Sequence, residues 1–204
     1  MLITIEGIEG VGKSTLINKL KNHFECLGHE VVLSREPGGT VLSEKIRSLL
    51  IDTNMTGAIC PMAELFLFYA SRFQNVAENI TPALERSCVT IIDRYYDSSK
   101  SYQGFARGLD LNLIEALNKN FGLPTPDITF WLDAPVEIGM GRALSRSKAD
   151  RFEQEKYSFF EKVRAGFAEI HRNNPDRFKR IDATLSQDQV LAEAIRLLEE
   201  YSKV

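Results

Sequence analysis

The sequence contains few cysteine and histidine residues, three of each in 204 positions. Cys26, Cys60 and Cys88 are odd in number and lie far apart, a pattern typical of small buried side chains in a reducing compartment. We therefore expect a cytoplasmic protein with buried thiols. The histidines show no ligand spacing, so no structural metal site is predicted.

Long apolar runs and an excess of basic charge are also absent. No apolar stretch approaches the length of a membrane span, and a strand is expected to start directly at the N-terminus, which leaves no room for a signal peptide. The net charge of −3 provides no global basic field for a nucleic acid or a membrane surface. An apolar content of 44% is typical of one compact domain, so we expect a single domain over residues 1–204.

The most informative segment is a glycine-rich loop near the N-terminus. Gly7, Gly12, Lys13 and Ser14 form the pattern Gly-x4-Gly-Lys-Ser between a predicted buried strand and a segment with helical spacing of apolar residues. Glycines allow successive backbone N–H groups to turn toward a phosphate, and the following helix points its positive end at the same place. The alternative, a chance glycine turn before a helix, is disfavoured by the complete strand–loop–helix order.

This loop predicts a nucleoside triphosphate site with bound Mg²⁺. Lys13 can reach the β- and γ-phosphates, and the Ser14 hydroxyl can ligate the metal. The predicted ATP-binding residues are Gly7, Ile8, Glu9, Gly10, Val11, Gly12, Lys13, Ser14 and Thr15.

Predicted strands and helices alternate along the whole chain. The strands are expected over residues 2–5, 30–34, 89–93, 128–133 and 178–182. The helices are expected after the glycine loop, over residues 40–50, 61–86 and 110–120, from residue 135 onward, and over 152–171 and 187–201. This order predicts an α/β fold, a five-stranded parallel sheet with helices on both faces, whose ligands bind at the carboxyl ends of the strands. Arg35, Arg94 and Asp133 follow strands, so we expect them to meet the glycine loop in one crevice.

Two helical segments have unusual composition. Residues 142–151 carry four basic residues and one acidic residue, and we interpret residues 142–153 as a short basic lid, with a solvated helix end as the alternative. The early part of helix 61–86 is apolar on nearly every side. Such a helix is buried all round or packs on a partner.

Two classes of phosphate-loop protein compete, a nucleotide-hydrolysing switch and a kinase. A guanine-nucleotide switch needs Asn-Lys-x-Asp and Asp-x-x-Gly. Asn118 and Lys119 begin the first pattern, but its fourth position is Phe121, and the second pattern occurs nowhere in the chain. Several arginines at the sheet edge and a basic lid favour a kinase, which must hold two phosphorylated ligands end to end.

Several stretches resemble one family of such kinases over essentially the whole chain. They are Glu6-Gly-Ile-Glu-Gly-Val-Gly-Lys-Ser14, Arg35-Glu-Pro-Gly-Gly-Thr40, Phe68-Tyr-Ala-Ser-Arg72, Asp93-Arg-Tyr95, Tyr102-Gln-Gly104, Asp150-Arg-Phe-Glu153 and Ile181-Asp-Ala183. In this combination they resemble bacterial thymidylate kinase. The resemblance implies a P-loop NTPase fold, transfer of the γ-phosphoryl group of ATP to dTMP giving dTDP, and a homodimer. A kinase of another nucleoside monophosphate or of a deoxynucleoside is the alternative, and no nucleic acid or membrane partner is expected.

The resemblance also implies which residues bind the base and phosphate of dTMP. Phe68 would stack on thymine and Arg72 would hydrogen-bond a base carbonyl, and their i, i+4 spacing places both on one helix face. A core aromatic is the alternative for Phe68. Arg94 would clamp the acceptor phosphate with its planar fork. Arg47 would be a weaker second clamp or an ordinary exposed arginine.

Further positions are assigned through the same resemblance. Glu9 would bind the sugar 3′-hydroxyl, and Tyr102 would occupy the place of a ribose 2′-hydroxyl. Gln103 and Ser99 would lie near the base. Asp93 would lie close to the Mg²⁺ shell.

The lid is expected to supply charge to the transferring group. Some members of the family carry an arginine after the acidic residue of the phosphate loop, where this chain has Gly10. We therefore expect Arg146 or Arg151 of the lid to act there, with Arg151 as a lid anchor in the alternative. A phosphate acceptor is already ionised at neutral pH, so no general base is required.

Overall fold

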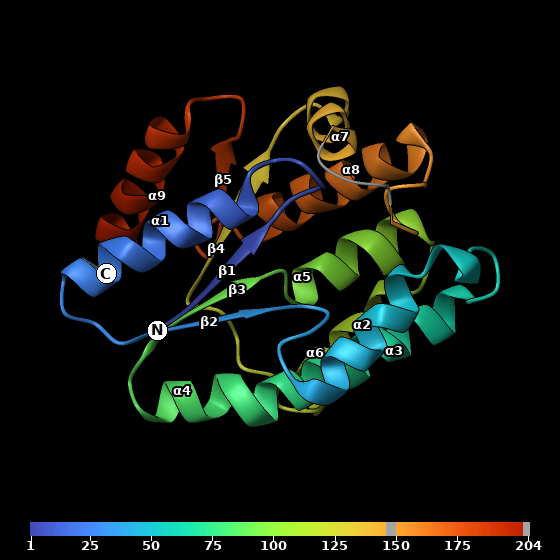
Figure 1. Cartoon of the computed structure of the whole chain (residues 1–204), viewed down its shortest axis with the longest axis horizontal. Helices are drawn as coiled ribbons and strands as arrows, with labels where there is room; N and C mark the ends of the chain where they lie inside the picture. Colours follow the sequence, from blue (N-terminus) through green and yellow to red (C-terminus); the bar gives the residue numbers. More distant parts are fainter. Residues whose placement is uncertain (146–149, 202–204) are drawn as a thin grey trace.

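The computed structural model describes residues 1–145 and 150–201. Its centre is a sheet of five parallel strands in the order β2-β3-β1-β4-β5 (Figure 1). The strands are β1 (Leu2–Glu6), β2 (Val31–Arg35), β3 (Val89–Asp93), β4 (Ile128–Asp133) and β5 (Phe178–Asp182). Because β1 and β4 are buried throughout, they consist mainly of apolar and β-branched residues. The predicted fold class is confirmed.

Helices cover both faces of this sheet. They are α1 (Lys13–Cys26), α2 (Val41–Ile51), α3 (Pro61–Asn75), α4 (Thr81–Glu85), α5 (Tyr96–Ser99), α6 (Leu111–Asn120), α7 (Val136–Leu144), α8 (Tyr157–Asn173) and α9 (Gln187–Tyr201). A 3₁₀ turn, η1 (Thr53–Met55), and two π-helical segments, η2 (Val76–Ile80) and η3 (Lys100–Ala106), complete the described elements. α1 and α9 lie side by side on one face, and η3 and α8 pack on the other (Figure 1).

The main core lies between the sheet and these helices. Ile5 and Phe130 of the sheet, Leu20 of α1 and Phe167 of α8 are all fully buried in it. On the far side of η3, helices α3 and α6 pack against η3, and α2 packs on α3. Helices α2 and α3 and the segment η3 therefore form one packed group next to the carboxyl ends of the strands.

The boundaries of two helices differ from those predicted. The long helix expected over residues 61–86 is interrupted by the π-helical turn η2. The helix expected from Phe152 begins only at Tyr157, because Asp150 Oδ1 accepts hydrogen bonds from the backbone N–H groups of Phe152 and Glu153 and holds them in a turn. The predicted elements also did not include α5 and η3.

The prediction of three buried thiols is wrong for two of them. Cys88 is buried, whereas Cys26 and Cys60 are exposed. Cys26 is the last residue of α1, beyond the buried stripe of that helix, and Cys60 precedes the first turn of α3. Both cysteines stand at the end of a helix, away from the residues that face the core, so their burial could not be inferred from residue type alone.

In the described residues, we find no helix with the length and apolar character that crossing a membrane requires.

Candidate active site

A cavity of about 310 Å³ opens where β1, β2 and β3 end. Its walls come from the phosphate loop, α2, α3, η3 and residues 150–153. Most of the residues predicted from the sequence line it, namely Glu9, Gly10, Gly12, Lys13, Ser14, Thr15, Arg47, Phe68, Asp93, Arg94, Ser99, Tyr102 and Gln103. Residues as far apart in the chain as Glu9 and Glu153 are thus brought together in one site.

Lys13 begins α1 and folds back over the phosphate loop. Its ammonium group donates to Ile8 O (3.0 Å) and Gly7 O (3.3 Å), so it stands among the carbonyls of the loop. Burial, together with the nearby Arg94, lowers the pKa of Lys13 to about 8. A polyphosphate bound there would favour the charged form.

Gly10 explains why the phosphate loop contains no arginine. Its φ is 73°, and a Cβ atom at this position would lie 1.9 Å from Gly139 O in α7. No side chain can be accommodated unless α7 moves. An arginine therefore cannot stand at this position of the loop.

Arg94 directly follows β3 and points into the cavity. Its Nη1 donates to Gly7 O (2.8 Å) and its Nη2 to Glu9 Oε1 (2.9 Å). Although burial alone lowers the pKa of Arg94, the oxygens of Tyr102, Glu9 and Asp93 raise it above its ordinary value, so the side chain is a permanent cation.

The backbone of Arg94 is held in a left-handed conformation with φ of 65°, which disfavours residues with a Cβ atom. Glu6, the last residue of β1, fixes this turn. Its carboxylate accepts hydrogen bonds from Tyr95 N (2.8 Å), Ser98 N (3.2 Å) and Ser98 Oγ (2.5 Å). Burial, together with the neighbouring Asp97, raises the pKa of Glu6 to about 7. Sequence analysis quoted Glu6 as part of a motif but assigned it no role.

Asp93 and Ser14 are suited to hold a divalent cation. Both line the cavity, and Asp93 Oδ1 is buried without a hydrogen-bond partner among the described residues. A buried carboxylate oxygen left unpaired is costly, and a hard cation would satisfy it. Residues 1–145 and 150–201 contain no cluster of three or more acidic, cysteine or histidine side chains that could hold a metal ion alone. Mg²⁺ binds through few protein oxygens together with phosphate and water, so the Ser14 hydroxyl and the Asp93 carboxylate are a fitting pair of donors.

Tyr102 and Glu9 form a second pair in the cavity. The Tyr102 hydroxyl lies 2.9 and 3.0 Å from the two carboxylate oxygens of Glu9, and only 5% of Tyr102 is exposed. Burial raises the pKa of Tyr102 well above 10, so its hydroxyl remains a donor. The ring is fixed next to the acidic residue predicted to bind the sugar.

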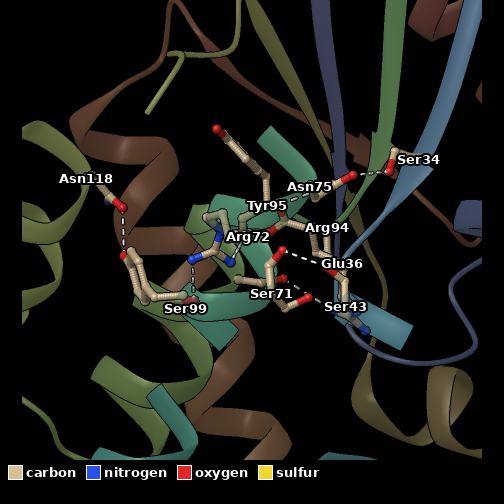
Figure 2. A network of polar contacts seen from close by, with 12 residues as sticks. Ser34, Glu36, Ser43, Ser71, Arg72, Asn75, Arg94, Tyr95, Ser99 and Asn118 are labelled. Carbon is tan, nitrogen blue, oxygen red and sulfur yellow. Dashed lines mark hydrogen bonds and ion pairs between the residues drawn. The ribbon is translucent and has the colours of Figure 1, made fainter. Parts of the chain in front are cut away.

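Arg72 is the centre of a buried polar network (Figure 2). Its Nε donates to Glu36 Oε2 (2.6 Å), its Nη1 to Ser99 Oγ (3.0 Å) and its Nη2 to Tyr95 O (3.1 Å). Burial raises the pKa of Glu36, against the opposing effect of Arg72. The guanidinium also lies over the ring of Tyr69, 4.7 Å from its centroid. Glu36 and Ser99 line the cavity in front of Arg72, and sequence analysis missed the part that Glu36 plays.

The remaining cavity residues are held by their neighbours. Arg47 Nη1 donates to Pro37 O (2.9 Å), and burial lowers the pKa of Arg47. Gln103 Nε2 donates to Glu64 Oε1 (2.9 Å), and the ring of Phe68 faces the cavity from α3. Arg47 is therefore not an ordinary exposed helix arginine.

Some predicted site residues lie outside this cavity. Asp133 forms ion pairs with Arg164 (2.7 Å) and Arg180 (2.7 Å) and is 3% exposed, so the expectation that it meets the glycine loop in the crevice is wrong. Arg151 is 4% exposed and turned away from the cavity lining. Arg146 lies outside the described residues. The other predicted residues that do not line this cavity are Gly7, Ile8, Val11 and Arg72.

A second cavity, of about 430 Å³, lies on the other side of the phosphate loop. Gly10, Gly12 and Thr15 border both cavities, and Arg142 and Ala183 form part of the second. Arg142 Nη1 donates to Ala183 O (3.1 Å), which joins α7 to the end of β5. Sequence analysis did not predict this cavity, although it noted the stretch that ends at Ala183.

Comparisons with known proteins point to one family. The family model described as "Thymidylate kinase" matches residues 5–194. The thymidylate kinase of Acinetobacter baumannii strain AYE is 50% identical over 198 residues, which cover 97% of this chain and 100% of that protein. The thymidylate kinase of Desulfovibrio desulfuricans is 42% identical over 209 residues, with coverage of 98% and 96%. The crystal structure of thymidylate kinase from Ehrlichia chaffeensis has a TM-score of 0.78 at 34% identity and covers 98% of both chains.

Proposed function

This chain belongs to the thymidylate kinase family and phosphorylates dTMP to dTDP with ATP, and we propose on that premise how its residues divide the work. The observation that carries the proposal is the arrangement of two cavities on opposite sides of one phosphate loop. Such an arrangement can hold a donor and an acceptor with their phosphates meeting at the loop.

The acceptor phosphate binds to arginines in the first cavity. Arg94 offers a planar fork that can bind two phosphate oxygens once it leaves Glu9. Arg47 faces the same space from α2, and Arg35 lines it from the end of β2, where Glu44 now pairs with it at 3.0 Å. Three cations around one dianion account for the positive lining of this part of the cavity.

The nucleoside of dTMP occupies the part of this cavity bounded by α3 and η3. Phe68 stacks on the base, Gln103 lies beside it, and Ser99 and Arg72 present donors to a base carbonyl. Arg72 acts from behind Ser99, which accepts one of its N–H groups and is therefore free to donate its own hydrogen forward. Glu9 binds the 3′-hydroxyl.

Tyr102 determines the sugar. Its ring is buried between Glu9 and the aromatic side chains of Phe152 and Phe159, so it cannot move aside for a 2′-hydroxyl. A deoxyribose fits against the ring where a ribose would collide with it.

ATP binds from the other side of the phosphate loop. Lys13 and the loop N–H groups hold its β- and γ-phosphates, and its base lies in the second cavity beside Arg142. The planar guanidinium of Arg142, held by Ala183 O, offers a face on which a base can stack.

Transfer itself depends on positioning and on charge. The acceptor oxygen is already ionised at neutral pH, since the second pKa of a phosphomonoester is about 6, so no residue must remove a proton. Lys13 and Arg94 neutralise charge on the two phosphate groups from opposite sides. Mg²⁺, held by Ser14 and Asp93, would supply further positive charge to the phosphates of ATP. Arg146 of the lid is proposed to supply the charge that Gly10 cannot.

We further propose that two copies of the chain form a symmetric dimer through α2 and α3. Val41, Leu42, Met62 and Phe66 leave apolar surface exposed on these helices, with Val41 80% and Phe66 50% exposed. A second copy of the same surface would cover it. The single domain and the cytoplasmic location remain predictions from the sequence.

A comparison of acceptors tests the proposed function. With MgATP, initial rates are measured for dTMP, dUMP, UMP and thymidine by following ADP release. We expect dTMP to have the highest kcat/KM and thymidine to show no reaction above background, because thymidine lacks the phosphate through which Arg94 is proposed to bind the acceptor. Preference for UMP or for thymidine would contradict the proposal.

A further inference from the structure

A buried carboxylate outside the acceptor cavity has no role in the reaction as described so far. Glu64 lies on α3 with 1% of its surface exposed. It precedes Phe68 by four residues and Arg72 by eight, so the three share one face of the helix. Its Oε1 accepts hydrogen bonds from Gln103 Nε2 (2.9 Å) and Arg107 Nε (3.2 Å). Glu64 therefore touches η3 while it stands next to the residues that bind the base.

A second cation reaches this carboxylate from residues 150–156, called the strap below. Arg151 Nη2 lies 2.8 Å from Glu64 Oε2, an ion pair whose N–H is not aligned for a hydrogen bond. Arg151 Nε donates to Leu50 O (2.5 Å), and its backbone N–H donates to Ile51 O (3.2 Å). One end of the strap is thus fastened to both α2 and α3.

The other end of the strap is fastened through Glu155. Its Oε1 lies 2.6 Å from Arg107 Nη1, and Arg107 in turn contacts Glu64. Glu64, Arg107, Arg151 and Glu155 carry two negative and two positive charges, which balance. If the charge of Glu64 is removed, two guanidinium groups remain near one carboxylate in a poorly solvated place, which favours separation of the strap from the helices.

The strap forms one wall of the acceptor cavity. Asp150, Phe152 and Glu153 line it. The ring of Phe152 contacts Phe68 edge to face with 5.8 Å between centroids, and it contacts Tyr102 in the same way at 6.2 Å. The place where the strap is held therefore decides whether Phe152 covers the two residues that receive the base and the sugar.

We propose that Glu64 is a positioning residue for dTMP: through Arg151 and Arg107 it holds the strap against α2, α3 and η3, so that Phe152 closes the nucleoside part of the acceptor cavity. The inference rests on the proposed function, because that function assigns the cavity to dTMP. A released strap lets dTMP dissociate faster and admits water to the transfer site. ATP, bound across the phosphate loop, is unaffected.

Glu64→Gln tests this role, because it keeps the shape of the side chain and removes its charge. The dTMP Kd is measured by calorimetry, and kcat, both KM values and the ratio of ADP to dTDP formed are measured with MgATP. We expect the dTMP Kd to rise by about tenfold or more, with kcat within about threefold and the ATP KM within about twofold of wild type. The ADP to dTDP ratio should rise above one. Glu193→Gln, an exposed carboxylate on α9, is the matched control and should change none of these.

Two further variants separate positioning from a loss of folding. In Glu64→Gln/Arg151→Gln the charges balance again, so its dTMP Kd should lie closer to wild type than that of Glu64→Gln. Arg151→Gln alone lies on the strap and should weaken dTMP binding in the same direction, by about fivefold. A merely structural role would lower the amount of active enzyme and leave the dTMP Kd of the folded fraction unchanged.

The outcomes are distinguishable from failure of the proposed function. If the wild-type enzyme does not convert dTMP, the proposed function falls. If wild type converts dTMP, two results overturn the role of Glu64. The first is a folded Glu64→Gln variant whose dTMP Kd stays within about twofold of wild type. The second is a Glu64→Gln variant that does not fold, together with an Arg151→Gln variant that keeps wild-type dTMP affinity.

Discussion

Arg94 and Glu9 form an ion pair inside the acceptor cavity, with 2.9 Å between Nη2 and Oε1, although 85 residues separate them in the chain. Both side chains are largely buried, so each compensates the charge of the other. In the proposed binding mode, dTMP replaces this pair with two new contacts, its phosphate on Arg94 and its sugar hydroxyl on Glu9. The two ends of the acceptor are thereby recognised together.

Arg94→Lys is predicted to lower kcat/KM for dTMP by about a hundredfold, because a lysine keeps the charge but cannot bind two phosphate oxygens with a planar fork. The ATP KM should change little. Steady-state kinetics at saturating ATP measure the effect. Arg86→Lys, at an exposed arginine paired with Glu30, is the control. Loss of less than about threefold in Arg94→Lys would show that Arg94 is no clamp.

Tyr102→Ala is predicted to raise the efficiency with ribo-TMP relative to dTMP, since the buried ring is the steric barrier to a 2′-hydroxyl. Tyr102→Phe keeps the ring and loses only the hydroxyl contact with Glu9, so it should weaken dTMP binding while retaining the preference for deoxyribose. Parallel kcat/KM measurements with both acceptors decide this. An unchanged ratio in Tyr102→Ala would make Tyr102 an ordinary core residue.

Glu6 makes stability depend on pH. Burial raises its pKa from 4.5 to about 7, so the folded protein binds more protons than the unfolded chain in this range and its stability falls as pH rises from 4.5 through 7. This pKa shift corresponds to a change of roughly 3 kcal/mol in the free energy of unfolding. Glu6→Gln cannot titrate and can still accept from Tyr95 N. We expect the free energy of unfolding of Glu6→Gln, measured with urea, to rise relative to that of wild type when the pH is changed from 5 to 8. An equal difference in the free energy of unfolding between Glu6→Gln and wild type at pH 5 and at pH 8 would contradict this prediction.

Substitution of the two lid arginines, Arg146 and Arg151, is predicted to change different kinetic constants. Arg146→Ala should lower kcat at least about tenfold with little change in the dTMP KM, since its charge is needed mainly in the transition state. Arg151→Ala should instead raise the dTMP KM, because Arg151 is paired with Glu64 and Leu50 O. Kinetics of both variants at saturating MgATP make the comparison. If both keep the wild-type kcat, the charge comes from elsewhere, and Arg142 is the next to test.

The sheet and the phosphate loop could be predicted because their signals are local. The strand before Gly7 and the helix after Lys13 follow from hydrophobic pattern and glycine spacing, and parallel topology follows from alternation. These same rules bring Asp93 and Arg94 to the loop, because β3 and β1 are neighbours in the sheet.

The pairing of buried charges could not be predicted from local pattern. Arg72 was expected to face the base directly, but the structure commits its Nε to Glu36, which lies 36 residues earlier in the chain. Arg151 was expected either beside the phosphates or as a lid anchor, and the partner that it has, Glu64 on α3, was not predicted. Such contacts depend on which helices pack together, and no spacing within one helix reveals them. Composition likewise gave no sign that η3 would be π-helical.

The central claim, transfer from ATP to the phosphate of dTMP, is tested most directly by following the γ-phosphoryl group. The enzyme is incubated with γ-³²P-labelled ATP, Mg²⁺ and dTMP, and the products are separated by chromatography. We predict that the label appears in dTDP in a one-to-one ratio with ADP, that it does not appear when thymidine replaces dTMP, and that inorganic phosphate stays at background. Label released as inorganic phosphate whether or not dTMP is present, or label recovered in dTMP made from thymidine, would contradict the account.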